Sequence, residues 1–98
     1  MQNKKIVATR FGTDFRSVSS LVTVPLSPET LPERNLLIQI HYAGVNASDT
    51  NFAAGLYDRK LKPPFDLGFE GIGTIVLMGK AAEQSGKFKI GDAVALLG

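Results

Sequence analysis

Turn-forming residues interrupt this chain so often that a long helix has no room to form. Clusters of glycine, proline, asparagine and aspartate recur roughly every 8–12 residues along the 98-residue sequence. The segments between them are short, and several are rich in Val, Ile and Thr, which favour strands. This spacing predicts a mainly β, barrel-like domain with one short helix.

The expected strands can be placed from these interruptions and from hydrophobic alternation. The clearest is Leu36–Ala43, where Leu36, Ile38, Ile40 and Tyr42 share one face, as in a half-buried antiparallel strand. A short helix is expected over Thr50–Ala54, begun by Ser48 or Asp49 and ended by Gly55. The other expected elements are strands at Lys5–Arg10, Ser17–Val24 and Gly71–Met78, an extended Lys62–Phe65 loop, and two strand pieces in Phe88–Leu97 around a Gly91-Asp92 turn.

Composition excludes several kinds of chemistry. The chain has no cysteine and one histidine, so we expect no disulfide, no thiol nucleophile, and no Cys-rich or His-rich metal site. The net charge of +2 comes from dispersed residues, which argues against nucleic-acid binding. No apolar run is long enough for a membrane helix, and the first residues lack the apolar stretch of a secretion signal. The expected compartment is the cytoplasm, with the peroxisome and the mitochondrion left open.

Polar residues gather after the Leu36–Ala43 strand, where the chain enters a tight turn and a helix. Asn46, Ser48, Asp49 and Asn51 follow one another there, at a corner that exposes backbone N–H groups. One interpretation is a binding site. The other is structural: Asn46 supports a left-handed turn and Asp49 caps the helix.

A second candidate region surrounds Glu70, which lies among three glycines and beside Phe69. We interpret Glu70 as a buried, hydrogen-bonded carboxylate. The nearby Gly71-Ile72-Gly73 is not a dinucleotide-binding fingerprint, because Val76 stands where a third glycine is needed and a strand follows.

Four motifs occur in one order along the chain: AGVNASD at Ala43–Asp49, GLY at Gly55–Tyr57, PPFDLGFEGIGTIV at Pro63–Val76, and FKIGDAVA at Phe88–Ala95. Together they resemble the N-terminal GroES-like domain of medium-chain dehydrogenases/reductases, over Lys5–Gly98. The pattern is most similar to the zinc-independent quinone oxidoreductases, the group that includes the prostaglandin reductases. The resemblance implies that residues 1–98 form one GroES-like, partly open β-barrel with one or two short helices. We expect this domain to be incomplete at its C-terminus and truncated before a Rossmann domain.

The resemblance also implies an activity. Members of this group use NADPH to reduce the C=C bond of enones, such as 15-oxo-prostaglandins or quinone-like compounds. NADPH is held mainly by the Rossmann domain, so we expect the 98-residue chain alone to be inactive. For a full-length form, a homodimer is expected.

Site residues follow by the same resemblance. Zinc alcohol dehydrogenases carry a cysteine where this chain has Asn46 and a histidine where it has Phe69, so no zinc is expected. The implied roles are catalytic for Tyr57 and Asn46, cofactor-binding for Asn46, substrate-binding for Asn51, Phe69 and Tyr57, and structural support for Asp49 and Glu70.

Two other classes of function stay open on the sequence. One is a non-catalytic GroES-like module that pairs with a partner chain through a strand edge. The other is a small nucleic-acid-binding barrel, which the dispersed charge and the scarcity of aromatic residues disfavour.

Overall fold

The computed structural model describes residues 1–58 and 60–97, which group into two compact units. The β1 unit consists of Gln2–Pro25 and Gly44–Phe69. The β3 unit consists of Met1, Leu26–Ala43 and the described part of Glu70–Gly98.

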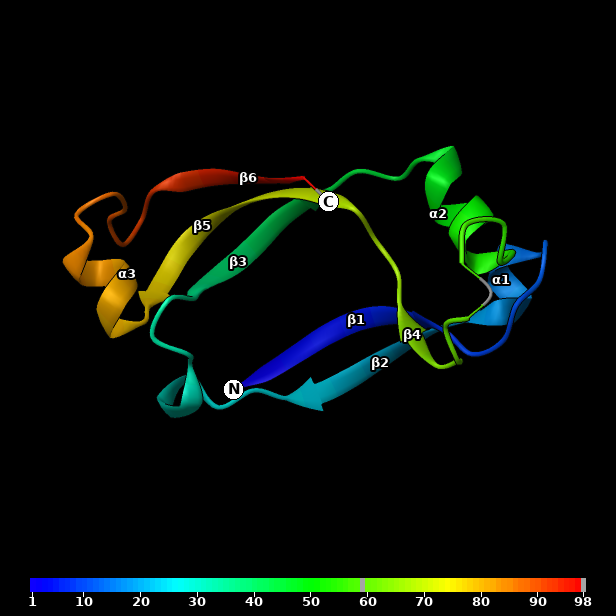
Figure 1. Cartoon of the computed structure of the whole chain (residues 1–98), viewed down its shortest axis with the longest axis horizontal. Helices are drawn as coiled ribbons and strands as arrows, with labels where there is room; N and C mark the ends of the chain where they lie inside the picture. The colour runs from blue at the N-terminus through cyan, green and yellow to red at the C-terminus, as the bar shows by residue number, and fades with distance from the viewer. Residues whose placement is uncertain (59, 98) are drawn as a thin grey trace. The chain divides into compact units, whose positions relative to one another are not determined.

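The β1 unit is built on a three-stranded antiparallel sheet in the order β2-β1-β4 (Figure 1). Strand β1 spans Gln2–Ala8, β2 spans Ser19–Pro25, and β4 is the two-residue strand Phe65–Asp66. Two short helices belong to the same unit: α1 at Phe15–Val18 and α2 at Ala47–Ala53. Its buried apolar residues are Val7, Ala8, Val18 and Ala53.

Strand β4 is tied to β1 by a few specific contacts. Val7 and Ala8 pair with Asp66 and Phe65, and the Leu67 N–H donates to the carbonyl of Ile6 at 3.0 Å. The Lys5 ammonium lies 2.9 Å from the Asp66 carboxylate. Because the Asp66 side chain is 70% exposed, this ion pair adds little stability, and the backbone bonds hold the strand.

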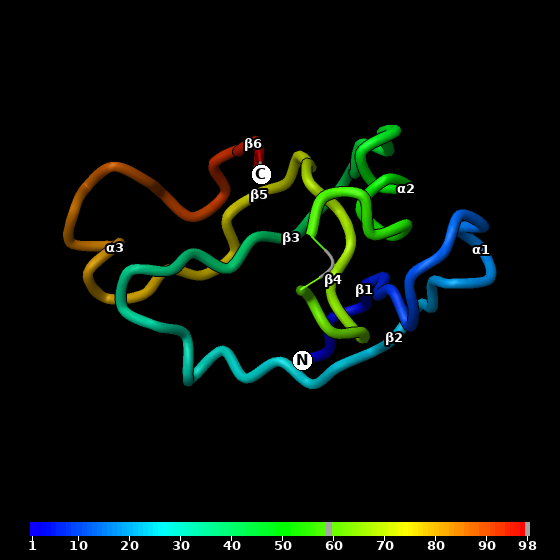
Figure 2. The backbone as a smooth tube through the Cα atoms, turned by 45° about the vertical axis from the view of Figure 1, so that its right-hand side comes forward, coloured from blue at the N-terminus to red at the C-terminus, as the bar shows by residue number. Residues whose placement is uncertain are grey.

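The β3 unit contains a second antiparallel sheet, in the order β3-β5-β6 (Figure 1). Strand β3 spans Leu36–Ala43, β5 spans Glu70–Met78, and β6 spans Ala93–Leu97. Helix α3 at Lys80–Gln84 follows β5, and the 3-10 turn η1 at Pro28–Thr30 precedes β3. Figure 2 lets the reader follow the chain from η1 into β3, and from β5 through α3 into β6. Ile75 and Ala82 are its buried apolar residues.

The close approach of the β3 backbone to the β5 backbone explains why residue 73, near the centre of β5, is glycine. A Cβ built on Gly73 would collide with the carbonyl oxygen of Gln39 and would lie 2.8 Å from Cγ2 of Ile38. The Gly73 position is buried. Strand β3 therefore packs against β5 at a distance that only glycine allows.

The predicted mainly β fold is confirmed, and the strand Leu36–Ala43 has the predicted bounds. Its face assignment was wrong, however. Register shifts between Leu37 and Ile38 and between Ile40 and Tyr42 interrupt the alternation. Ile40 pairs with Gly73 and Tyr42 with Ile72, which are neighbours in β5, so Ile40 and Tyr42 lie on opposite faces of the sheet.

Two other strand predictions need correction. The strand expected from Ser17 begins at Ser19, because α1 occupies Phe15–Val18. Of the two strand pieces expected in Phe88–Leu97, only the second forms. The Lys89 N–H, which a ladder would use, donates instead to the Asp92 carboxylate at 2.9 Å, and this bond helps close the turn at Gly91.

The predicted number of helices was also too low. The described residues contain three α-helices, and α3 was missed although Gly79 provides an N-cap and two alanines follow. Helix α2 begins at Ala47, earlier than expected, and its N-cap is Asn46. None of the helices in the described ranges is both long enough and apolar enough to cross a membrane.

We predict that Gly73→Ala destabilises the protein by about 1–3 kcal/mol or more, the usual range for overpacking, because the new methyl group meets backbone. Gly71→Ala is the matched comparison: its added Cβ would lie 3.1 Å from the carbonyl oxygen of Tyr42, so the loss should be smaller. Thermal or urea unfolding of both variants checks this. Equal stability of the two variants would contradict the close-approach explanation.

Candidate functional site

The candidate site is built around the start of α2, in the β1 unit. Asn46 is the N-cap of this helix, with an extended backbone at φ −126° and ψ 163°. Its backbone N–H donates to Oδ2 of Asp49 at 2.8 Å. The predicted left-handed turn at Asn46 is therefore wrong, because an N-cap residue takes extended backbone angles.

Asp49 is the buried carboxylate of this region. Its side chain is only 6% exposed, and Oδ2 is occupied by the Asn46 N–H. The other oxygen, Oδ1, is buried without a hydrogen-bond partner among the described residues. A carboxylate in this position helps to fix the entry into α2.

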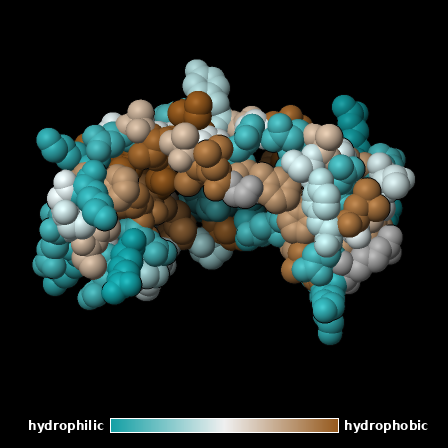
Figure 3. Space-filling view, turned by 45° about the horizontal axis from the view of Figure 1, so that its top comes forward, coloured by the Kyte–Doolittle hydropathy of each residue, from teal (hydrophilic) through white to brown (hydrophobic). Residues whose placement is uncertain are grey.

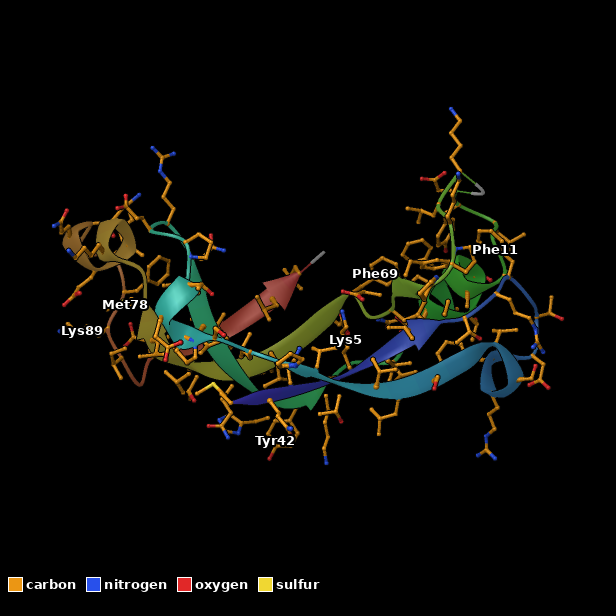
Figure 4. All side chains as sticks on the ribbon, turned by 90° about the horizontal axis from the view of Figure 1, so that it is seen from below. Lys5, Phe11, Tyr42, Phe69, Met78 and Lys89 are labelled. Carbon is orange, nitrogen blue, oxygen red and sulfur yellow. The ribbon has the colours of Figure 1, made fainter. Side chains whose placement is uncertain are left out.

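An aromatic cluster fills the space beside the helix. Phe52, on α2, lies between three rings: its centroid is 5.1 Å from Phe65, 5.3 Å from Phe69 and 6.4 Å from Tyr57. Phe11 extends the cluster through Phe65, at 5.6 Å. Figure 4 labels Phe11 and Phe69 at the end of the β1 unit that carries α2. Tilted rings at these separations are favourable aromatic pairs.

Tyr57 lies at the exposed margin of this cluster. The Asn51 side-chain Nδ2 donates to the Tyr57 hydroxyl oxygen at 3.2 Å. Tyr57 as a whole remains 58% exposed. An apolar surface and a phenol hydroxyl therefore lie next to each other, an arrangement suited to an apolar compound that carries one carbonyl group.

The structure brings most of the predicted site residues together. Asn51, Tyr57 and Phe69 are joined directly or through Phe52, and exposed Asn46 begins the same helix. Glu70 belongs to the other unit. It is exposed and is the first residue of β5 in the β3 unit, so its predicted burial is wrong. Strand alternation explains this: Glu70 shares a face with exposed Ile72, whereas Gly71 and Gly73 are buried on the other face.

Sequence reasoning missed Phe52, the residue that connects the cluster. Its neighbours in sequence are small or polar, so it gave no alternating or helical pattern of apolar residues. The available signal was its place on the expected helix, directly between Asn51 and the Gly55 stop.

Comparison with known proteins assigns the chain to a family. Residues 32–97 match the alcohol dehydrogenase GroES-like domain. The chain belongs to this family. The match starts before β3 and runs through β6, and it includes every residue of α2 and of the aromatic cluster except Phe11.

Curated relatives of this GroES-like chain are oxidoreductases. It is 44% identical over 94 residues to a probable quinone oxidoreductase of Leishmania amazonensis, which covers 96% of the chain and 26% of that relative. It is 43% identical over 95 residues to prostaglandin reductase-3 of Mus musculus, covering 96% of the chain and 24% of that relative. The chain thus spans about a quarter of the length of these relatives.

Solved structures agree on the fold. The Escherichia coli quinone oxidoreductase, in complex with NADPH, is 26% identical and covers 95% of the chain and 26% of its own length, with a TM-score of 0.72. A mycobacterial quinone oxidoreductase is 30% identical over 94% of the chain and 26% of its own length, with a TM-score of 0.68. Each of these structures matches nearly the whole of the 98-residue chain.

The donor set of the site does not suit zinc. Asn46 offers a neutral amide and Phe69 offers no lone pair, whereas zinc in proteins takes thiolate, imidazole or carboxylate ligands. Within residues 1–58 and 60–97, no three His, Cys, Asp or Glu side chains gather closely enough to hold a metal ion.

We predict that Asp49→Ala lowers the free energy of unfolding by about 1–2 kcal/mol, the usual cost of losing a helix-capping partner. Asp14→Ala is the control, because Asp14 is the N-cap of α1 but its side chain makes no capping bond. The control should stay within about 0.5 kcal/mol of the parent protein. Chemical denaturation measures both changes. A harmless Asp49→Ala substitution would show that the carboxylate does not hold the start of α2.

Proposed function

We propose that this chain forms the substrate side of an NADPH-dependent oxidoreductase that reduces the C=C bond of enones or quinone-like compounds. The observation that carries the proposal is the exposed Tyr57 hydroxyl, held by Asn51 beside the Phe52 aromatic cluster. The relatives named quinone oxidoreductase and prostaglandin reductase-3 support the same class of reaction. The 15-oxo-prostaglandins are the enone class that the second of these names suggests.

The residues of the site fit part of the cofactor. A side-chain amide presents one acceptor and two donors, which complements the carboxamide of a nicotinamide ring. Asn46 has such an amide, and it is exposed at the start of α2. When bound, NADPH supplies the hydride that is added to the β-carbon of the enone. The E. coli quinone oxidoreductase, whose structure contains NADPH, supports this choice of cofactor.

Tyr57 is proposed to stabilise the charge that develops on the substrate. Reduction of an enone at its β-carbon moves negative charge to the carbonyl oxygen. A phenol that donates a hydrogen bond to this oxygen lowers the energy of the transition state more than that of the bound substrate. The exposure of Tyr57, of which more than half is accessible to solvent, supports this role.

Phe69 and Phe52 are proposed to shape the apolar part of the site. The Phe52 ring lies next to both the Phe69 ring and the Tyr57 ring, at centroid separations of 5.3 and 6.4 Å. A flat, conjugated substrate packs well against such rings, and its contact excludes water from the polar atoms. Asn51 and Asn46 supply the polar groups at the edge of this surface. Asp49 supports them by holding the start of α2.

The isolated 98 residues are proposed to have no turnover of their own. They offer the nicotinamide and substrate end of a site, whereas the pyrophosphate of NADPH needs a backbone cradle of the Rossmann type. For a full-length form, a homodimer in the cytoplasm remains part of the proposal.

A non-catalytic role as a pairing module is the second candidate. Its supporting observation is exposed apolar surface on the β3 unit, where Ile72, Ile90 and Leu97 are each more than half exposed. Figure 3 shows hydrophobic side chains gathered on the part of the surface that belongs to this unit. Enone-dependent oxidation of NADPH by the full-length protein separates the two candidates, because a pairing module would show none.

We predict that Tyr57→Phe in the full-length protein lowers kcat by about 10²- to 10³-fold, as the loss of one oxyanion donor typically does. KM for the enone and the binding of NADPH should change little. Steady-state kinetics with an enone, and titration with NADPH, measure these quantities. An activity of Tyr57→Phe within twofold of the parent protein would reject the donor role and leave Tyr57 as a packing residue.

We predict that chelation leaves the activity unchanged. Because Asn46 and Phe69 are poor zinc ligands, the full-length enzyme should reduce an enone at the same rate before and after dialysis against EDTA. The rate of NADPH oxidation is the measurement. Loss of activity that added zinc restores would contradict the proposed zinc-independent site.

A further inference from the structure

Asn51 contacts Tyr57 through one specific hydrogen bond, from its Nδ2 to the hydroxyl oxygen at 3.2 Å. We propose that Asn51 is a positioning residue that aims the Tyr57 hydroxyl hydrogen at the substrate carbonyl, instead of binding the substrate itself. This inference rests on the proposed function and assigns the sequence-predicted substrate residue Asn51 a different task.

The hydrogen-bond inventory of the phenol carries the argument. A tyrosine hydroxyl has one hydrogen to donate and an oxygen that accepts. The Asn51 amide N–H already occupies the accepting side, so the phenolic hydrogen cannot point at that nitrogen. The hydrogen is therefore left to point away from the Asn51 amide, and Tyr57, which is 58% exposed, leaves room for a ligand on that side. A ligand carbonyl on that side therefore meets a donor that already has the required direction.

The backbone holds the two partners in register. The N–H of Leu56 donates to the carbonyl of Asn51 at 3.1 Å, and the N–H of Gly55 donates to the carbonyl of Phe52 at 3.0 Å. Gly55 adopts φ +79°, which ends α2 and turns the chain back. Tyr57 follows directly after this turn. Its hydroxyl and its ring thus meet the side chains of the same two residues, Asn51 and Phe52, that bind the turn.

The same hydrogen bond also tunes the strength of the donor. An N–H that donates into a hydroxyl oxygen polarises the O–H bond, and successive hydrogen bonds strengthen one another. As negative charge grows on the substrate oxygen, the Tyr57 hydroxyl shares its hydrogen more strongly, and the Asn51 amide stabilises the charge left on the phenol. Asn51 thereby acts in the transition state without touching the substrate.

Two substitutions in the full-length protein test this inference. Asn51→Ala removes the amide, and we expect kcat to fall roughly tenfold. The fall should not exceed about 100-fold, the usual cost of misplacing a reacting group, here the Tyr57 hydroxyl. KM for the enone should change little. Asn51→Asp keeps the size of the side chain but replaces the donor with an acceptor, which captures the phenolic hydrogen. We expect Asn51→Asp to be less active than Asn51→Ala. A merely structural role predicts the reverse order, because aspartate preserves the shape of the side chain.

A double variant separates this inference from the proposed function. In a Tyr57→Phe background no hydroxyl remains to be aimed, so adding Asn51→Ala should lower kcat by less than twofold. Asn3→Ala, which removes an exposed amide from β1, is the control and should behave like the parent protein. Thermal unfolding checks that every variant is folded.

Each alternative outcome has a distinct meaning. Higher activity in Asn51→Ala would show that the amide accepts the phenolic hydrogen, and a raised KM at unchanged kcat would show direct substrate binding; either result overturns the inference. Full additivity of the two substitutions also overturns it. If the single variant Tyr57→Phe has the kcat of the parent protein, the proposed donor role is wrong, and the inference is wrong with it. If only Tyr57→Phe lowers kcat, the proposed function stands and the positioning role is wrong.

Discussion

Packing around Phe52 is the interaction on which the candidate site depends. One ring on a seven-residue helix contacts Phe65 on β4, Phe69 before β5, and Tyr57 after the turn that ends the helix. A helix this short is not stable through its own backbone bonds, and most of its stability must come from such packing. The same contacts that keep α2 folded therefore also determine where its polar residues lie. Stability and binding geometry are coupled through this one side chain.

Sequence patterns predicted the parts of the fold that depend on local chemistry. Leu36–Ala43 was placed with the right bounds because alternating residues and flanking turn formers act over a few positions. The two register shifts in its pairing with β5 were not predicted, since they depend on a partner strand that is distant in sequence. Helix α3 was missed for a similar reason: it is only five residues long, and the bond from the Ala82 N–H to the Glu33 carbonyl ties it to a distant segment.

The candidate site, too, was predicted only in part from the sequence. The resemblance placed Asn51 and Tyr57 in one region, and the structure joins them by a hydrogen bond. It could not distinguish Glu70 from Asp49, because each is a carboxylate within one of the four motifs. Asp49 is buried and receives a backbone N–H, whereas Glu70 lies on the exposed face of a strand. That difference depends on which way a side chain points in the folded chain.

The two-residue strand β4 has a consequence for local opening. Phe65 faces the aromatic cluster, while the adjacent backbone is bound to β1, with the Leu67 N–H donating to Ile6. Such a short pairing is among the first to open when a protein fluctuates without unfolding. Each opening also withdraws Phe65 from Phe52, so the rate at which the Leu67 amide exchanges its hydrogen with solvent reports how often the aromatic cluster comes apart. A single amide signal thus follows the pairing that keeps Phe65 beside Phe52.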